Sequence, residues 1–215
     1  MTIGSAPRRA RARRGEGDRL RPEILAAAGR LLAERGDENA VSIRMIADAV
    51  GVTPPSIYLH FPDKDALIEA VCEERFAAFD AALEEAAASH DDPLEALRAR
   101  GRAYVRFALD NPEHYRVIFM TRHDRAMDLA ELVSPGPESR AGAKAFAHLV
   151  AAVERAAGAG AIAAPNPVLT ALHLWAAFHG LASLLISEPG FPWPDLDLLV
   201  ESLLDLQEQG MRART

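Results

Sequence analysis

Apolar residues recur every three or four positions along almost the whole chain, and no stretch shows the strict alternation of a half-buried strand. The pattern begins at Ile24, Leu25 and Ala28, and Gly36 supplies the first stop. The sequence therefore predicts an all-α protein of about nine helices. The predicted helices cover residues 19–35, 43–50, a short segment from 54, and then 64–89, 93–111, 114–120, 141–157, 168–187 and 195–209.

Turn residues set the predicted helix ends. Ser42 is placed to cap the second helix, and Gly51 is placed to end it in a left-handed conformation. Thr53 is predicted to cap the third helix, and the proline pair after it occupies the first turn, where a missing N–H costs nothing. Asp63 is predicted to cap the fourth helix. Residues 122–140 contain a Pro-Gly-Pro run and are predicted to form a mobile loop.

The charge is distributed unevenly. The 215 residues carry 24 Lys and Arg against 31 Asp and Glu, a net charge of −7 at pH 7. Residues 1–64 hold eleven basic and eight acidic side chains, a net of +3, whereas residues 65–215 hold thirteen and twenty-three, a net of −10. Residues 1–18 form a predicted disordered basic arm that either contacts a polyanion or is a solvated leader. Its arginines before the first acidic residue are Arg8, Arg9, Arg11, Arg13 and Arg14.

Composition limits the class of protein. Apolar residues make up 49% and charged residues 26%, which excludes a wholly disordered chain. Cys72 is the only cysteine, so an internal disulfide is impossible and a reducing, cytoplasmic setting is expected. The most apolar stretch, Leu172–Ile186, is shorter than the roughly 18 residues that suggest a membrane span, so we expect no membrane helix. The N-terminus lacks the apolar core of a secretory signal.

Residues 42–61, SIRMIADAVGVTPPSIYLHF, have the form of a helix-turn-helix. Helices this short are unstable alone, so they need an apolar floor from the first and fourth helices. The predicted inward-facing residues are Ile46, Val50, Val52, Ile57 and Phe61. Exposed Tyr58 and His60 next to Lys64 fit contacts with phosphate, and a plain helical hairpin is the alternative.

Continued through Leu67, this run resembles the tetracycline-repressor family of bacterial regulators, over about residues 21–81. The residues that match the family's pattern are Ser42, Arg44, Ile46, Ala47, Gly51, Val52, Ile57, Tyr58, His60, Phe61, Lys64 and Leu67. Val50 and Thr53 replace the Ala and Ser that are usual in the family, and both changes are mild. Pro55 stands where many members have Gly or Ala, a departure that bears on base specificity and not on DNA binding.

The resemblance implies a transcriptional repressor that binds a double-stranded DNA operator as a homodimer and is released by a small-molecule effector. It implies a DNA-binding domain at residues 19–65 and a ligand-binding and dimerisation domain at 66–215. The implied DNA contacts are Tyr58, His60 and Lys64 on phosphates, Ser42 and Arg44 on the backbone or an edge base, and Thr53, Pro54, Pro55 and Ser56 facing the bases. Because the base-facing side chains are small, thymine methyls, one hydroxyl and DNA shape must supply much of the discrimination.

The C-terminal part is less diagnostic. Residues 172–181 resemble a C-terminal subtype marked by Trp, His and Gly at this spacing. The last two predicted helices are apolar on more than one face, and Ala177 and Gly180 are small enough to let a partner backbone approach. These features predict a dimeric four-helix interface. A buried core of a monomer is the alternative. A predicted effector pocket has aromatic walls with a few polar groups, although each residue alone is also explained by core packing. Its residues are Tyr104, Phe107, Tyr115, Phe119, Trp175, Phe178 and His179.

Sequence motifs for catalysis are missing. No His, Asp or Glu pair shows metal-ligand spacing, and the chain has no GxSxG run or glycine-rich phosphate loop. We therefore expect no metal, no cofactor and no enzyme activity. A DNA-packing protein without sequence preference is an alternative function, which the acidic residues 65–215 disfavour, and a small all-α enzyme is a more remote one.

Overall fold

The structure, a computed structural model, describes residues 17–120, 132, 134–136 and 139–212, with side chains from Arg19 onward. Within these ranges there are nine α-helices and no strand, so the all-α prediction is confirmed. Residues 1–16 of the predicted basic arm and most of the predicted loop at 122–140 lie outside the described residues. Gly17 and Asp18, which were predicted to end the disordered arm, instead begin the first helix.

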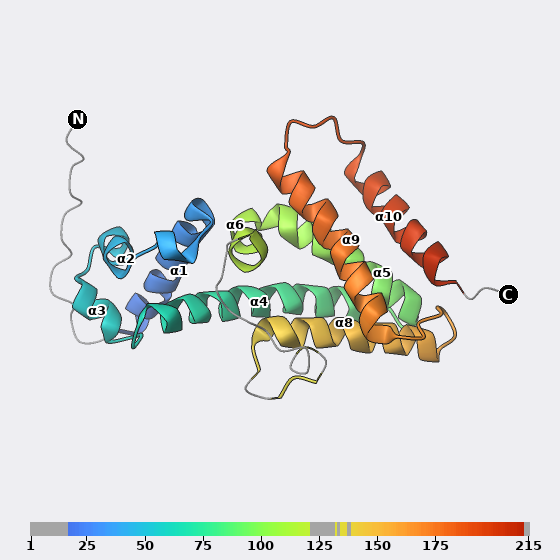
Figure 1. Cartoon of the computed structure of the whole chain (residues 1–215), viewed down its shortest axis with the longest axis horizontal. Coiled ribbons are helices and arrows are strands. Elements are labelled where there is room, and N and C mark those ends of the chain that lie inside the picture. Colours follow the sequence, from blue (N-terminus) through green and yellow to red (C-terminus); the bar gives the residue numbers. More distant parts are fainter. Residues whose placement is uncertain (1–16, 121–131, 133, 137–138, 213–215) are drawn as a thin grey trace. The chain divides into compact units, whose positions relative to one another are not determined.

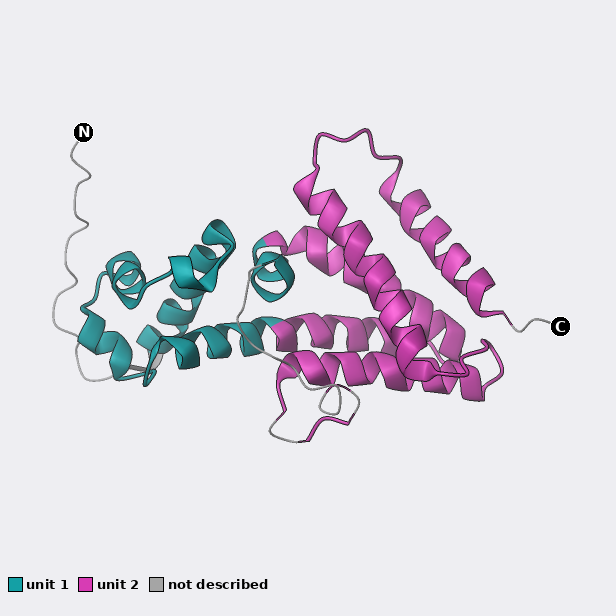
Figure 2. Ribbon diagram, in the orientation of Figure 1, with its two compact units in different colours: residues 1–75, 113–125 teal, residues 76–112, 126–215 magenta. Residues whose placement is uncertain are grey.

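The chain divides into two compact units, which Figure 2 shows in different colours. Figure 1 labels the helices of the same chain. Unit 1 comprises Met1–Arg75 and Glu113–Arg125, and unit 2 comprises Phe76–Pro112 and Ala126–Thr215. The helices of unit 1 are α1 (Gly17–Arg35), the 3-10 turn η1 (Glu38–Ala40), α2 (Ile43–Val50), α3 (Pro54–Tyr58), the first part of α4 (Lys64–Ala88), most of α6 (Pro112–Tyr115) and the π-helical turn η2 (Arg116–Met120). Unit 2 contains the rest of α4, α5 (Pro93–Asp110), α8 (Ala141–Gly158), α9 (Pro167–Ser187) and α10 (Leu196–Met211).

The core of unit 1 forms around α1. This helix packs against α2 on one side and against η2, and Ile24, Ala28 and Leu32 on it are fully buried. Tyr115 and Val117 are buried in the same unit. The spacing of apolar residues predicted a short helix at residues 114–120. It could not predict that this segment packs against α1, because such spacing reports only local structure.

The core of unit 2 forms around α5, which packs against α8, α9 and α10. Gly101 lies on the side of α5 that faces both α9 and α10. A Cβ atom added to Gly101 would lie 2.6 Å from Cζ of Phe178 on α9 and 2.9 Å from Cδ2 of Leu204 on α10. The absent side chain therefore lets α9 and α10 both close onto α5.

Three helices of unit 2 begin at a side chain that accepts a backbone N–H three residues further on. Asp92 accepts from Glu95 at 2.9 Å, and Asn166 and Asp195 each make the same contact at 3.0 Å at the starts of α9 and α10. These caps satisfy backbone donors that have no partner inside the helix. They explain why the predicted and observed starts of these helices differ by one residue at most.

Helix α9 corrects the expectation about membrane length. The apolar segment was counted as Leu172–Ile186, but the helix begins at Pro167 and runs for 21 residues. Its most apolar 18-residue window has a mean hydropathy of 1.6, so the helix is long and apolar enough to cross a membrane by length and composition alone. In unit 2 this helix packs against α5 and α8. Only 22% of its most apolar window is buried within the chain, so much of its apolar surface is left for another contact.

Candidate nucleic-acid interface and effector site

Helix α2 has a defined start and a defined end. The Oγ of Ser42 accepts a hydrogen bond from the N–H of Met45 at 3.3 Å. Gly51 has a φ of +77°, a left-handed conformation that favours glycine, and its N–H bonds back to the last turn of the helix. Both predicted ends of α2 are therefore confirmed, and together they fix where the chain turns toward α3.

Helix α3 starts differently from the prediction. Thr53 stands at the cap position, but its side chain makes no capping hydrogen bond. Its Oγ1 lies 3.1 Å from the Oγ of Ser56, so the two hydroxyls are paired with each other. The proline pair at the first two positions reduces the need for a cap, because proline has no N–H to satisfy. The result is a hydroxyl pair at the start of α3.

The two short helices rest on an apolar floor. Ile46, Ala47 and Ile57 are fully buried, and Phe61 is nearly so. Val50 and Val52 were predicted to be part of this floor and are only half-buried, because they lie at the turn between the helices. The guanidinium of Arg21 lies 5.0 Å from the centre of the Phe61 ring, a cation–π distance that covers one side of the floor.

The predicted DNA-contacting residues have their side chains on the outer side of this floor. Those that are exposed are Ser42, Arg44, Thr53, Pro55 and Tyr58, and those that are half-buried are Pro54, Ser56, His60 and Lys64. None of the nine is buried. Leu59 was missed by the sequence analysis, although it is 84% exposed. Its position two residues after buried Ile57 places it across the helix, and that signal could have found it.

Lys64 occupies the first position of α4, a helix of 25 residues. The Oδ1 of Asp63 accepts the N–H of Ala66 at 2.7 Å and so caps the helix, as predicted. The helix start carries a partial positive charge, to which the ammonium of Lys64 adds. This end of α4 can therefore attract a phosphate group.

The structure divides the seven predicted effector residues between the units. Tyr115 and Phe119 belong to unit 1, where their ring centres lie 4.9 Å apart. The other five belong to unit 2: Tyr104, Phe107, Trp175, Phe178 and His179.

Two aromatic residues that the sequence analysis missed join the five in unit 2. Phe79 of α4 lies edge-on to Tyr104 at 5.1 Å and to Phe107 at 5.4 Å. Phe146 of α8 lies 6.1 Å from Trp175 of α9. The seven rings of unit 2 thus form an aromatic cluster from four helices: Phe79, Tyr104, Phe107, Phe146, Trp175, Phe178 and His179.

His179 is the polar centre of this aromatic cluster. Its Nδ1 lies 3.3 Å from the hydroxyl of Tyr104, and its Nε2 lies 3.4 Å from the Oγ of Ser183. Burial lowers the pKa of His179, because an apolar environment disfavours the charged imidazolium. The ring is therefore neutral at pH 7 and able both to donate and to accept a hydrogen bond.

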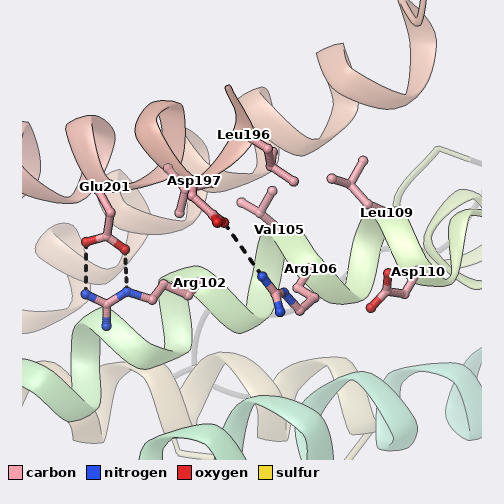
Figure 3. A pocket seen from close by; sticks show the side chains of 9 residues that line it. Arg102, Val105, Arg106, Leu109, Asp110, Leu196, Asp197 and Glu201 are labelled. Carbon is pink, nitrogen blue, oxygen red and sulfur yellow. Dashed lines mark hydrogen bonds and ion pairs between the residues drawn. The ribbon is translucent and has the colours of Figure 1, made fainter. Parts of the chain in front are cut away.

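A separate groove of about 250 Å³ lies between α5 and α10 (Figure 3). Its apolar residues include Val105 and Leu109, and none of the seven predicted effector residues lines it. One wall carries the Arg102–Glu201 pair, whose two hydrogen bonds are 2.5 and 2.9 Å long. Figure 3 shows these side chains spanning the space between the two helices.

Solved structures of bacterial proteins have the same fold as this chain. A TetR family transcription regulator from Marinobacter aquaeolei VT8 matches with a TM-score of 0.73 and 22% identity, over 94% of this chain and 100% of that chain. FadR from Bacillus subtilis, solved in complex with stearoyl-CoA, matches with a TM-score of 0.67 and 18% identity, over 89% of this chain and 99% of that chain. At these identities the likeness concerns the fold alone.

One curated protein is also similar to this chain in amino-acid sequence. The HTH-type transcriptional activator FasR of Mycolicibacterium smegmatis is 31% identical over 102 residues, which are 47% of this chain and 46% of FasR. The chain thus matches less than half the length of this curated relative.

Two family profiles match the chain in the order expected for such a regulator. The profile "Bacterial regulatory proteins, tetR family" matches residues 24–71, which include the helix-turn-helix. The profile "Tetracyclin repressor-like, C-terminal domain" matches residues 97–206, just over half of the 215 residues. The chain therefore belongs to the tetracycline-repressor family of bacterial regulatory proteins.

Proposed function

We propose that the chain is a transcription regulator that binds a double-stranded DNA operator through α2, α3 and the start of α4. One observation carries this proposal: the nine residues assigned to DNA all keep their side chains accessible above a buried apolar floor. Tyr58 is 51% exposed, so about half of its ring and hydroxyl is accessible to a partner.

The proposed contacts divide by chemistry. Tyr58, His60 and Lys64 hold phosphates and fix the position of α3 in the major groove, while Ser42 and Arg44 contact the backbone or an edge base. Thr53, Pro54, Pro55 and Ser56 face the bases. Since the hydroxyls of Thr53 and Ser56 are paired with each other, a base must compete with this bond or share it.

The exposed apolar side chains of unit 2 support a proposal that the chain forms a homodimer. On α9, Leu169 and Leu184 are about half exposed, and on α10 Leu198 is 64% and Leu206 63% exposed. Exposed leucines on two helices that both pack against α5 are typical of an interaction surface. We propose that a second copy of the chain covers them, which gives two helix-turn-helix units for the two half-sites of an operator.

The aromatic cluster of unit 2 is the proposed effector site. It offers apolar walls and one polar centre, His179 with Tyr104, which suits a ligand that is mostly apolar and bears a hydrogen-bonding group. Because α4 carries both Phe79 of the cluster and Lys64 at its start, a ligand that moves α4 alters the DNA contact. Release requires tighter ligand binding to the DNA-free state. FadR with its stearoyl-CoA makes acyl thioesters a first class to screen.

Repression is the proposed direction of regulation, in the cytoplasm and without catalysis. The name of FasR, a transcriptional activator, favours activation as a second candidate. Transcription in vitro from a promoter bearing the operator separates them. The full chain lowers transcript yield if it is a repressor, and an increase supports activation.

Selection of operator sequences from random duplex DNA, followed by footprinting with the full chain, tests DNA binding. We expect enrichment of a two-fold symmetric sequence with half-sites about one or more helical turns apart. Binding without enrichment would support a DNA-packing protein, and no binding at low salt would contradict the proposal.

A further inference from the structure

Three potential metal ligands meet between α4 and α8 in unit 2. Asp80 and Glu84 stand four residues apart on α4, so they share one face of the helix. His148 is on α8, 68 positions beyond Asp80 in the chain. No local motif joins residues that far apart, which is why the sequence suggested no metal.

Distances in this cluster suit a small cation. Nδ1 of His148 lies 2.9 Å from Oδ2 of Asp80 and 3.8 Å from Oε1 of Glu84. One ligand atom from each of the three residues lies within 4.8 Å of the others. Tetrahedral coordination at about 2.0–2.2 Å from each donor places the donors roughly 3.4 Å apart. A shift of about an ångström therefore brings all three donors into range.

Arg100 of α5 adds an independent observation. It is only 3% exposed, and its guanidinium contacts Oε1 of Glu84. Its Nε has no hydrogen-bond partner. The positive charge of Arg155 on α8 also acts on Arg100, but the side chain of Arg155 is exposed, so solvent screens it.

The charges around Arg100 leave room for a further cation. Two carboxylates face one buried guanidinium, so a negative charge remains on the side of Asp80 and His148. Carboxylates that bind metals are commonly held by such an outer hydrogen-bonding partner, which fixes their direction. Arg100 is therefore placed to orient Glu84.

We propose that Asp80, Glu84 and His148 bind a divalent transition-metal ion such as Zn²⁺, with Arg100 as the positioning residue for Glu84. An imidazole nitrogen beside two carboxylates suits first-row transition metals, whereas Mg²⁺ and Ca²⁺ take oxygen ligands. The ion binds Nδ1 of His148, a proton held on that atom is released to solvent, and the neutral metal-bound imidazole carries its proton on Nε2. The bound ion links α4 to α8 within unit 2, and this role does not depend on DNA binding.

Titration of the chelator-treated full chain, without a histidine tag, with Co²⁺ tests the proposal. Calorimetry gives the stoichiometry, and visible absorption reports nitrogen and oxygen ligands around the ion. We expect one Co²⁺ per chain, displaced by Zn²⁺, which is the stronger binder in the usual order of affinities. Millimolar Mg²⁺ should leave the Co²⁺ spectrum unchanged.

Variants locate the ion. His148→Ala removes a half-exposed side chain and should weaken Co²⁺ binding at least about tenfold, by comparison with substitutions around known sites. His90→Ala is the matched control, because His90 is exposed and lies outside the cluster. It should bind as the unaltered chain does.

Asp80→Asn provides a second, nearly isosteric variant, and it should also weaken binding at least about tenfold. Circular dichroism confirms that each variant is folded. Three results would overturn the proposal: no binding by the unaltered chain, binding that His148→Ala leaves unchanged, or an equal loss in His90→Ala, which indicates adventitious surface ions.

Discussion

Apart from Leu59, the helix-turn-helix of unit 1 and the last two helices of unit 2 differ in the large side chains that they expose. On the helix-turn-helix of unit 1, Arg44 and Tyr58 are exposed and the isoleucines are buried. On α9 and α10 of unit 2, leucines are exposed, while Arg98 and Arg102 of α5 pair with acidic residues of α10. Some of the twenty-three acidic side chains in residues 65–215 are thus paired within unit 2, while the net charge of this segment stays at −10. The polar surface of the helix-turn-helix suits the proposed contact with DNA, and the apolar surface of α9 and α10 suits the proposed contact with a second copy.

The largest expected effect comes from Gly180→Leu, which tests the apolar surface of unit 2. A Cβ atom at Gly180 meets nothing within 4 Å, so the chain itself can accommodate a side chain there. A second copy packed closely on α9 cannot. We expect a folded monomer in sedimentation and an operator affinity about a thousandfold weaker, close to non-specific binding.

Gly158→Leu is the control for this change, since Gly158 is equally open but lies at the end of α8. It should leave the dimer intact. A stable Gly180→Leu dimer with normal operator affinity would place the dimer interface elsewhere.

The double variant Tyr58→Ala with Lys64→Ala tests the polar surface of unit 1. It should weaken binding to every DNA sequence by roughly ten- to a hundredfold and lower the salt slope by about one, because one ionic phosphate contact is lost. Equilibrium titrations at several salt concentrations measure both quantities. Circular dichroism should be unchanged because neither side chain is buried.

Arg30→Ala serves as the comparison, because this exposed arginine of α1 lies outside the helix-turn-helix. It removes one charge from the same unit without touching a predicted DNA contact. Equal losses in the two proteins would mean that charge alone, and not the helix-turn-helix face, carries the binding.

Helix positions, and the accessibility of the proposed DNA-binding residues, could be predicted because their signals are local. Ser42, Gly51 and Asp63 act on neighbours within four residues, and each makes the predicted contact. Thr53 is the exception. Both a backbone N–H and the hydroxyl of Ser56 lie close to it in the chain, and its hydroxyl pairs with Ser56.

Contacts between helices could not be predicted in this way. Tyr115 has the aromatic character of the other predicted effector residues, but it packs in unit 1. Phe79 and Phe146 join the aromatic cluster from helices whose mutual placement depends on the whole core. For the same reason, spacing along the chain did not bring Asp80 and His148 together.

Gly101→Ala would show how tightly unit 2 is packed beneath its exposed leucines. The new methyl group would overlap Phe178 and Leu204, so we expect a loss of about 1–3 kcal/mol in the free energy of unfolding. Urea denaturation at fixed protein concentration measures it. Gly210→Ala on α10, where the space is open, should be neutral or slightly stabilising. A neutral Gly101→Ala would show that α9 and α10 can move away from α5 at little cost.

Deletion of residues 1–14 extends the comparison to the basic arm. If the five arginines contact DNA, truncation lowers operator affinity more at low salt than at high salt, by roughly severalfold at 50 mM, because each contact releases counterions. Dimerisation should be unaffected. Identical salt dependence for the truncated and full chains would identify the arm as a solvated leader.

The smallest expected effect concerns the charged pairs between α5 and α10. The hydrogen bond from Arg102 holds the pKa of Glu201 below its usual 4.5, with burial opposing and Arg98 assisting. The carboxylate therefore stabilises the folded chain above the unfolded pKa, and this contribution is lost as the pH falls through the folded pKa. Because Glu201 is 41% exposed, we expect Arg102→Met to cost less than about 1 kcal/mol at pH 7.

Urea denaturation of Arg102→Met and the unaltered chain, at equal protein concentration and at a series of pH values from 7 down to about 3, measures this contribution. The difference between them should shrink as the pH falls below 4.5 and in high salt, since both weaken the ionic contact. Arg106→Met is the control, because Arg106 and Asp197 are 3.7 Å apart and mostly exposed, so their pair should contribute nothing measurable. A difference that stays constant down to the lowest pH would mean that Arg102 stabilises α10 by packing of its aliphatic stem. The contact between α5 and α10 would then be apolar in effect, like the exposed surface of α9 and α10.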